Sequence, residues 1–344
     1  MTSANTAGVK PITTGPAPAA PGAGPKVSRP VAILRKWGTV IVIALTALAF
    51  SIASEYFLSF SNLNNILFSM IVSAMVSMGL TFVVVVGSFD LSVGIIVTTT
   101  SVVLAFLIPH VGPWVAIVLA LAVASCIGVI SGLLVTFGRL SGIVVTLAMT
   151  FVLGGINIFL TGGYQVPVAY AETAFLFLGQ GKVGIVAFPV LVLIAVFIVA
   201  HLVSTKTRVG HYIVAVGDNP LAAYYSGISV YKWVIVSFML AGLLAGAGGV
   251  VLTSISSSAQ PVGGQGYLLE AFAAVYLGAT VLGKGKPHVL GTLLGVFFLY
   301  MVNSGMNMVG FPSAARQLFA GLILILAVGA NAALNREELH MKFI

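Results

Sequence analysis

Apolar residues occur along this chain in long runs that are separated by short polar stretches. A membrane-crossing helix needs about 20 predominantly apolar residues. Segments of about that length recur from end to end, so the pattern predicts an all-α integral membrane protein with about ten transmembrane helices. They are expected at 38–58, 65–87, 91–109, 114–136, 142–161, 183–203, 233–254, 267–283, 289–308 and 316–334.

Two breaks between these segments, near 87–91 and 254–268, are predicted to be broken or re-entrant backbone inside the bilayer. The first is very short and contains Gly87 and Asp90, and the second begins with the polar run SISSSAQPVGGQG. Irregular backbone persists at membrane depth only where protein or a water-filled cavity satisfies its polar groups. We therefore expect the second break to line a cavity.

Charge gives the orientation. With the N-terminus in the cytosol, only two of the 15 lysines and arginines, Lys182 and Arg316, fall on the outside. Cytosolic loops carry the excess of basic residues in membrane proteins, so both termini are predicted to be cytosolic. Residues 1–30 are rich in Ala, Pro and Gly without periodicity and are expected to form a disordered cytosolic tail.

Composition supports the membrane class. Hydrophobic residues make up 59% of the chain and charged residues 6%, whereas a soluble domain carries roughly 25% charge. The formal charge of +8 is scattered singly over short loops, which argues against a nucleic-acid partner. The single cysteine, Cys126, lies in an apolar run and is predicted to be a small buried packing residue.

Small residues are spaced for close helix packing. Glycines four residues apart lie on the same face of a helix. Because they have no side chains there, the backbone of a neighbouring helix can approach closely. Three such pairs are expected to serve packing rather than substrate binding: Gly128 with Gly132, Gly242 with Gly246, and Gly291 with Gly295.

Asp90 is the strongest candidate for a functional residue, because a carboxylate between two very apolar stretches is costly in a membrane. One interpretation is structural: Asp90 caps a helix that begins at Leu91, with Gly87 permitting the break. The other is functional: Asp90 and Ser92 line the path of a polar solute. Both interpretations stand at this point.

Glu270 is the second carboxylate within the apolar ranges. Polar and aromatic side chains near it, among them Tyr267 and Tyr276, suit a sugar or polyol, and Pro261 lies in the same stretch. The alternative places Glu270 at the outer interface, in water. The predicted solute pathway therefore consists of Asp90, Ser92, Gln260, Pro261, Gln265, Tyr267 and Glu270.

No catalytic or metal-binding set is present in the sequence. The run GATVLGK (278–284) fits the start of a phosphate-binding loop, but Gly285 stands where the hydroxyl residue is needed, and an apolar span precedes the run. We therefore expect no enzyme activity, no cofactor and no nucleotide site in this chain.

Four stretches, in order, resemble the sugar-type permeases of bacterial ABC importers, the family of the ribose, xylose and arabinose permeases. The likeness covers roughly residues 60–330. It is carried by GSFDLSVG (87–94), SGIVVTLAMTFVLGGI (141–156), TRVGHYIVAVGDNPLAAYYSGISV (207–230) and SSSAQPVGGQGYLLEAFAAVYLGATVLGKGKPHVLGTLLG (256–295).

The resemblance implies a transmembrane permease domain at 31–344, in the bacterial cytoplasmic (inner) membrane, without its own ATPase. Implied partners are a cytosolic ATP-binding subunit, a periplasmic or surface-anchored sugar-binding protein, a second permease copy or paralogue, and membrane lipid. Residues 204–232 would be the cytosolic coupling loop, with Leu221 to Tyr225 as a short helix. Its implied coupling residues are Thr207, Arg208, Gly210, Gly217, Asn219, Ala222, Ala223 and Gly227.

The functional hypothesis is therefore translocation of a monosaccharide or related polyol, driven by the separate ATP-binding subunit. The alternative is an ion-coupled secondary transporter of a small polar solute, which typically uses a relay of membrane carboxylates. Only Asp90 and Glu270 are candidates for such a relay in this sequence.

Overall fold

Helices account for almost all of the computed structural model, which describes residues 29–168, 173–280 and 285–334. The membrane-type helices are α1 (Arg29–Ala53), α2 (Phe60–Ser69), α3 (Ile71–Val85), α4 (Val93–Val111), α5 (Pro113–Thr136), α6 (Gly142–Thr161), α8 (Phe188–Lys206), α11 (Val230–Ser256), α12 (Gly266–Thr280), α13 (Val289–Met308) and α14 (Ser313–Leu334). Shorter elements are α7 (Thr173–Gln180), α9 (Arg208–Asp218), α10 (Pro220–Tyr225), β1 (Val166–Pro167), β2 (Lys182–Val183), β3 (Val186–Ala187) and β4 (Ser258–Ala259).

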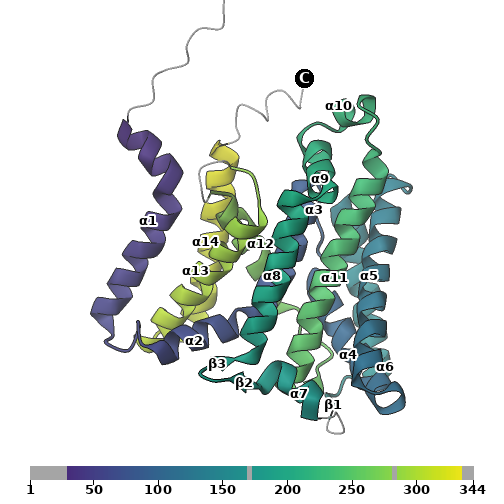
Figure 1. The fold of residues 1–344 in the computed structure, drawn as a ribbon, viewed down its shortest axis with the longest axis horizontal. Helices are drawn as coiled ribbons and strands as arrows, with labels where there is room; N and C mark the ends of the chain where they lie inside the picture. Colours follow the sequence, from purple (N-terminus) through teal and green to yellow (C-terminus); the bar gives the residue numbers. More distant parts are fainter. Residues whose placement is uncertain (1–28, 169–172, 281–284, 335–344) are drawn as a thin grey trace, which may run out of the picture.

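The long helices run between two ends of the molecule (Figure 1). One end carries α9 and α10, and the opposite end carries α7 and the short strands. The strands form two antiparallel pairs, β1 with β4 and β2 with β3. The first described turn of α1 and the last turn of α14 lie toward the α10 end, as the prediction of two termini on one side requires.

Six of these helices are long and apolar enough to cross a membrane by length and composition: α4, α5, α6, α8, α11 and α13. The bent pair α2–α3 makes a seventh if it is one span. Shorter apolar helices lie within α1, α12 and α14, at Ile41–Ala53, Gly266–Thr280 and Ser313–Leu326. A multi-pass helical membrane protein is confirmed, and the count of about ten spans stays a prediction.

The packing centre is α11, which lies against α5, α3 and α4. The predicted glycine pairs make these approaches possible. A Cβ on Gly128 would meet the backbone of Phe238, and one on Gly242 would meet the carbonyl of Ala124. Gly291 of α13 similarly faces Gly278 of α12. The packing interpretation of the glycines is confirmed, because side chains there would push the helices apart.

The segment 65–87 is not the single helix that the apolar run predicts. It is divided at Met70 into α2 and α3, which are bent by 48°. Asn62 of α2 donates to the Phe57 carbonyl oxygen at 2.7 Å and accepts from Ser304 Oγ of α13 at 2.7 Å. These bonds hold α2 against α13 while α3 turns into the core, so polar contacts outside the apolar run set the bend.

Cys126 was expected to be buried, and this is wrong: it is exposed. The buried positions of α5 include Ala116, Ala120, Ala124 and Gly128, at helical spacing. Cys126 is two residues from Ala124 and therefore lies on the far side of the helix. An apolar run alone does not show which face of a membrane helix meets protein.

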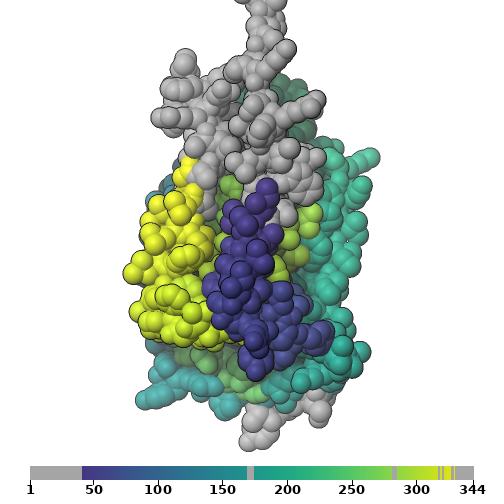
Figure 2. Space-filling view, turned by 90° about the vertical axis from the view of Figure 1, so that its left-hand side faces the viewer, coloured from purple at the N-terminus to yellow at the C-terminus, as the bar shows by residue number. Residues whose placement is uncertain are grey.

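Helix α1 lies on the outside of the bundle. Figure 2 shows it in front of the helices that follow later in the chain. Ile43, Ala47 and Phe50 pack against the rest of the bundle. The ring of Phe50 is 5.3 Å from that of Phe57 and packs over Gly305 of α13. The disordered tail predicted for 1–30 lies, except for its last two residues, outside the described part of the chain.

Candidate functional site

Asp90 lies in the irregular stretch between α3 and α4 and is fully buried. Its Oδ1 accepts hydrogen bonds from the Ser92 amide at 2.8 Å and from Ser92 Oγ at 2.5 Å. Helix α4 begins at Val93 rather than at Leu91, so the predicted position of the cap is wrong by two residues. Asp90 instead closes a turn just ahead of the helix, which is a variant of the structural interpretation.

The same stretch is fixed by its surroundings. Gly87 has φ +89°, a conformation that residues other than glycine rarely adopt. Helix α6 supplies the partners of the exposed backbone: Thr146 Oγ1 accepts from the Leu91 amide at 2.9 Å, and Thr150 Oγ1 donates to its carbonyl oxygen at 3.2 Å. Protein groups thus satisfy this broken segment, as irregular backbone in a membrane requires.

The structural role of Asp90 gives a first prediction. Asp90→Ala removes both bonds and leaves the buried Ser92 amide without its acceptor, which we expect to lower stability by about 1–3 kcal/mol. Asp90→Asn keeps an oxygen at the same place and should melt like the wild type. Thermal melting of the purified full chain measures both. Equal melting of the alanine variant would contradict the structural role.

The second irregular segment packs onto the start of α4. The Gly264 amide donates to Thr98 Oγ1 at 2.9 Å, and a Cβ on Gly94 would approach the Gly264 carbonyl oxygen to 2.8 Å. Pro261 and Gly264 are buried, while Gln260 and Gln265 are exposed. The second predicted break therefore meets α4 at Gly94, just after the first break, a contact that the sequence did not indicate.

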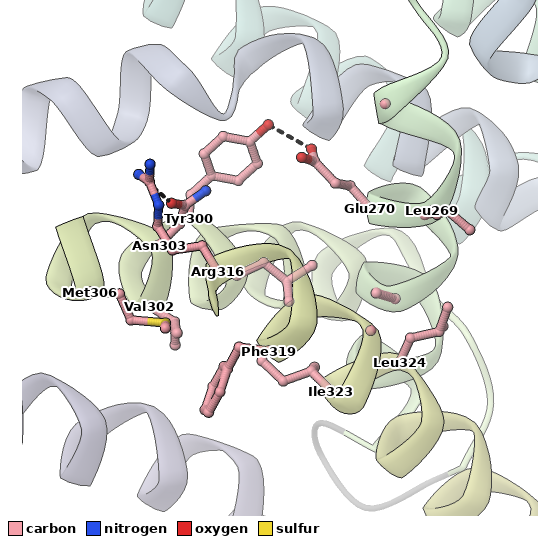
Figure 3. Close-up of a pocket in the computed structure, with 14 residues that line it drawn as sticks. Leu269, Glu270, Tyr300, Val302, Asn303, Met306, Arg316, Phe319, Ile323 and Leu324 are labelled. Atoms are coloured by element: carbon pink, nitrogen blue, oxygen red, sulfur yellow. Dashed lines mark hydrogen bonds between the residues drawn. The ribbon is translucent and has the colours of Figure 1, made fainter. Parts of the chain in front are cut away.

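A cavity of about 480 Å³ opens between α12, α13 and α14 (Figure 3). Glu270 of α12 lines it, and its Oε2 accepts a hydrogen bond from Tyr300 Oη of α13 at 2.7 Å. Figure 3 shows the Tyr300 ring between Glu270 and the guanidinium of Arg316. Glu270 is therefore tied to a neighbouring helix at this cavity, and its place on the solute pathway stays a prediction.

A second cavity of about 380 Å³ adjoins the first. The two share Tyr300, Asn303 and Arg316 in their linings. Arg316 Nη1 donates to Asn303 Oδ1 at 3.3 Å and to Asn307 Oδ1 at 3.2 Å. Asn62, Asn65, Ser69 and Ser304 complete the polar part of this second lining. We call the two together the polar cavity.

The polar cavity includes one of the seven predicted pathway residues, Glu270, with Gly266 and Leu269 from the same segment. Asp90 and Ser92 are buried just before α4 and do not line the cavity, and Tyr267 packs on an apolar cluster instead. Sequence reasoning missed Tyr300 and Arg316 and the asparagines of α2 and α13. The available signals were the spacing of Asn303 and Asn307 in an apolar helix, and Arg316 as an exception to the charge rule.

The segment 204–232 is more ordered than a loop. Helix α9 was not predicted, although Val209, Ile213 and Val216 have helical spacing on one face. Gly217 of α9 approaches α3 so closely that a Cβ there would overlap the Val85 carbonyl oxygen. Gly210 packs in the same way on Ser204, so both glycines bring α9 against the spans.

The short helix predicted at Leu221 to Tyr225 is present as α10, with Asn219 as its N-cap: Asn219 Oδ1 accepts from the Ala222 amide at 2.9 Å. Gly227, with φ +79°, ends the turn that follows. Ala223 is buried, whereas Ala222 and Arg208 are exposed. Thr207 Oγ1 donates to the Val203 carbonyl oxygen at 2.7 Å, at the junction of α8 and α9.

Contacts also join this segment to the α12–α13 connection. Lys286 Nζ lies 2.7 Å from Asp218 Oδ1 in an exposed ion pair. Residues 281–284, which include most of the remainder of the apparent phosphate loop, lie outside the described residues. Its first glycine, Gly278, is inside α12 and faces α13, so a helix stands where a nucleotide site needs a strand.

The arrangement is that of a membrane permease: a helical bundle, a solute-sized polar cavity near one end, and an ordered surface segment at the other. Within the described residues no cluster of His, Cys, Asp or Glu could hold a metal ion. Residues 62–328 match the family described as branched-chain amino acid transport system, permease component. The chain belongs to this family of ABC-importer permeases and is a multi-pass protein of the bacterial cytoplasmic membrane.

Similar proteins agree with the sugar-type resemblance. The chain is 36% identical over 299 residues to the ribose import permease of Escherichia coli strain K12, which covers 86% of this chain and 93% of the relative. It is 30% identical over 314 residues to the L-arabinose permease of Azospirillum brasilense, covering 90% and 91%. The D-allose permease of Escherichia coli K12 is 28% identical over 304 residues, covering 88% and 93%. No solved structure matches the chain.

Proposed function

We propose that this chain is the permease subunit of an ABC importer that moves a monosaccharide or related polyol into the cell. The observation that carries this proposal is the polar cavity, because it places hydrogen-bonding side chains around the aromatic ring of Tyr300 within an apolar bundle. Sugars offer a polar perimeter and an apolar ring face, which suits such a lining. The similarity to ribose, arabinose and allose permeases supports the same solute class.

Energy comes from outside this chain in the proposed mechanism. Helix α10 presents Leu221, Tyr224 and Tyr225 to the exterior, with exposed fractions of 64%, 66% and 79%. Exposed apolar residues that are grouped on one surface are typical of protein-docking sites. We assign this surface to a cytosolic ATP-binding subunit, which uses the ATP, so that the permease itself needs no cofactor and is not an enzyme.

The full assembly has further partners. A periplasmic or surface-anchored binding protein delivers the sugar to the end that carries α7, and a second copy of the chain or a paralogue completes the permease pair. The proposed topology has ten spans with both termini cytosolic: α1, the α2–α3 pair, α4, α5, α6, α8, α11, α12, α13 and α14. The termini of the described chain lie at the α10 end, which supports this count (Figure 1).

Uptake by sealed membrane vesicles tests the proposal against an ion-coupled transporter. The complete transporter, energised with internal ATP and treated with ionophores, should accumulate radiolabelled sugar from a panel that includes ribose, arabinose and allose. One observation favours the ion-coupled transporter, which would use buried carboxylates to bind its ion. Asp90 Oδ2 is buried and has no hydrogen-bond partner among the described residues. Accumulation that follows a proton or sodium gradient without ATP would establish the rival and refute the proposal.

A further inference from the structure

Among the residues that the structure describes, Arg316 is the only charged one that lines both parts of the polar cavity. Its Nη1 is engaged by Asn303 and Asn307. A guanidinium has five N–H donors in a rigid planar fork. The Nε and Nη2 donors of Arg316 have no protein acceptor among the described residues, so they are available to a molecule in the cavity.

No carboxylate in the described part of the chain forms an ion pair with Arg316. The ion pair that the structure records in the described residues joins Lys286 and Asp218, at the α10 end. Glu270 lines the same cavity, but Figure 3 shows it on the far side of the Tyr300 ring, bonded to Tyr300 Oη. A guanidinium that is bonded only to neutral amides lacks the stronger, bidentate pairing that it makes with a carboxylate or phosphate.

The orientation of the chain in the membrane does not account for a basic residue at the position of Arg316. Basic residues favour the cytosolic side of membrane proteins, and Arg316 lies in the first turn of α14, at the end of the bundle opposite α10. Lys182, the other basic residue at this end, is exposed in β2 and does not line the cavity. Of these two basic residues at the end opposite α10, Arg316 is thus the one that lines the polar cavity.

The remaining lining supplies mostly donors. Asn303 and Asn307 use their Oδ1 atoms to accept from Arg316, which leaves the amide N–H groups for a ligand. Asn62 donates to the Phe57 carbonyl oxygen and accepts from Ser304, so both ends of its amide are engaged in holding α2 in place. A planar guanidinium binds carboxylate and phosphate oxygens through two parallel hydrogen bonds, and the neighbouring amides extend that donor surface.

We propose that the polar cavity takes an anionic monosaccharide, with its carboxylate or phosphate on Arg316 and its ring beside Tyr300. This inference rests on the proposed function and narrows its substrate class. The hydroxyl groups of the sugar then meet Asn303, Asn307 and the free oxygen of Glu270. Neutral sugars can enter the same space but cannot neutralise the guanidinium, so they bind more weakly.

Ligand-dependent melting of the purified full chain in lipid nanodiscs tests this without the selectivity of a binding protein. The probes are D-ribose, D-ribonate and D-ribose 5-phosphate at equal millimolar concentration and matched ionic strength. We expect the anionic sugars to raise the melting temperature and ribose to raise it less, since stabilisation grows with occupancy. The carboxylate and phosphate arms identify which anion is preferred.

Three variants separate recognition from a purely structural role. Arg316→Gln retains an amide donor for Asn303 and Asn307 but removes the charge, and should abolish the preference for anions. Arg316→Lys retains the charge and should keep part of the preference. Lys182→Gln is the matched control, because it removes the other outer charge, and should respond like the wild type.

The inference would be overturned if ribose and the anionic sugars raised the melting temperature of the wild type equally. It would also be overturned if Arg316→Gln kept the preference for anions. Arg316 would then only hold α14 to α13. Either result leaves the proposed function intact. The proposed function fails separately, in the vesicle assay, if ATP drives no uptake of any sugar, neutral or anionic.

Discussion

Ala222→Glu is expected to reduce ATP-driven sugar uptake by roughly tenfold or more, while the melting temperature of the permease stays at the wild-type value. Ala222 is exposed on α10 beside Leu221, so the spans do not need it. A carboxylate placed in an apolar docking interface is desolvated without a partner, which costs more than the 1.4 kcal/mol that corresponds to a tenfold change. Vesicle uptake and ATP hydrolysis, measured together, should show hydrolysis no longer producing transport.

Ala223 is the matched control and separates docking from folding. Ala222 and Ala223 are both implied coupling residues, but Ala223 is only 4% exposed and belongs to the apolar cluster that contains Ile213 and Val216. Ala223→Glu should therefore lower the melting temperature as well as uptake. Normal coupled uptake by Ala222→Glu would show that α10 is not the docking surface of the ATP-binding subunit.

Local sequence signals were sufficient to locate most helices and both breaks. Each apolar run of span length contains a helix, because a membrane leaves backbone groups few other ways to be satisfied. Gly87 and the Asn219-Pro220 pair mark conformations that nearby residues define, a positive φ and a helix start. These features depend on neighbours in the chain, so the sequence alone could predict them.

The polar cavity could not be predicted in this way. Its lining joins α2, α12, α13 and α14, so Asn65, Glu270, Asn303 and Arg316 meet only after the helices pack. Hydropathy gives the length of a membrane helix but not its rotation, and rotation decides which side chains face one another. The same limit explains the error at Cys126, where the apolar run gave no information on the buried face.

The amphipathic helix α9 was missed for a different reason. The residues Arg208, Asp218 and the two glycines indicated a surface loop, and the glycines are poor helix formers. In the structure, the glycines at 210 and 217 allow contact with Ser204 and Val85. Tertiary packing thus outweighs local propensity, and the two glycines fix the position of the surface segment.

Gly242→Leu is expected to destabilise the bundle by roughly 3 kcal/mol, near the upper end of the usual range for overpacking. Gly242 lies at the contact between α11 and α5, where an added Cβ would overlap the Ala124 carbonyl oxygen. The obstacle is backbone rather than a flexible side chain, so the two helices must separate, and the dispersion contacts along the interface weaken. Melting of the purified chain and its level in the membrane should both fall.

The matched control is Gly155→Leu in α6. This residue is also in the middle of an apolar helix, but a Cβ there has no neighbour within 4 Å and the position is exposed. The same substitution should leave the melting temperature unchanged or slightly raised, because leucine is the better helix former. If both variants melted alike, the close approach of α11 and α5 would not be what stabilises the centre of this fold, and the glycine pairs would need another explanation.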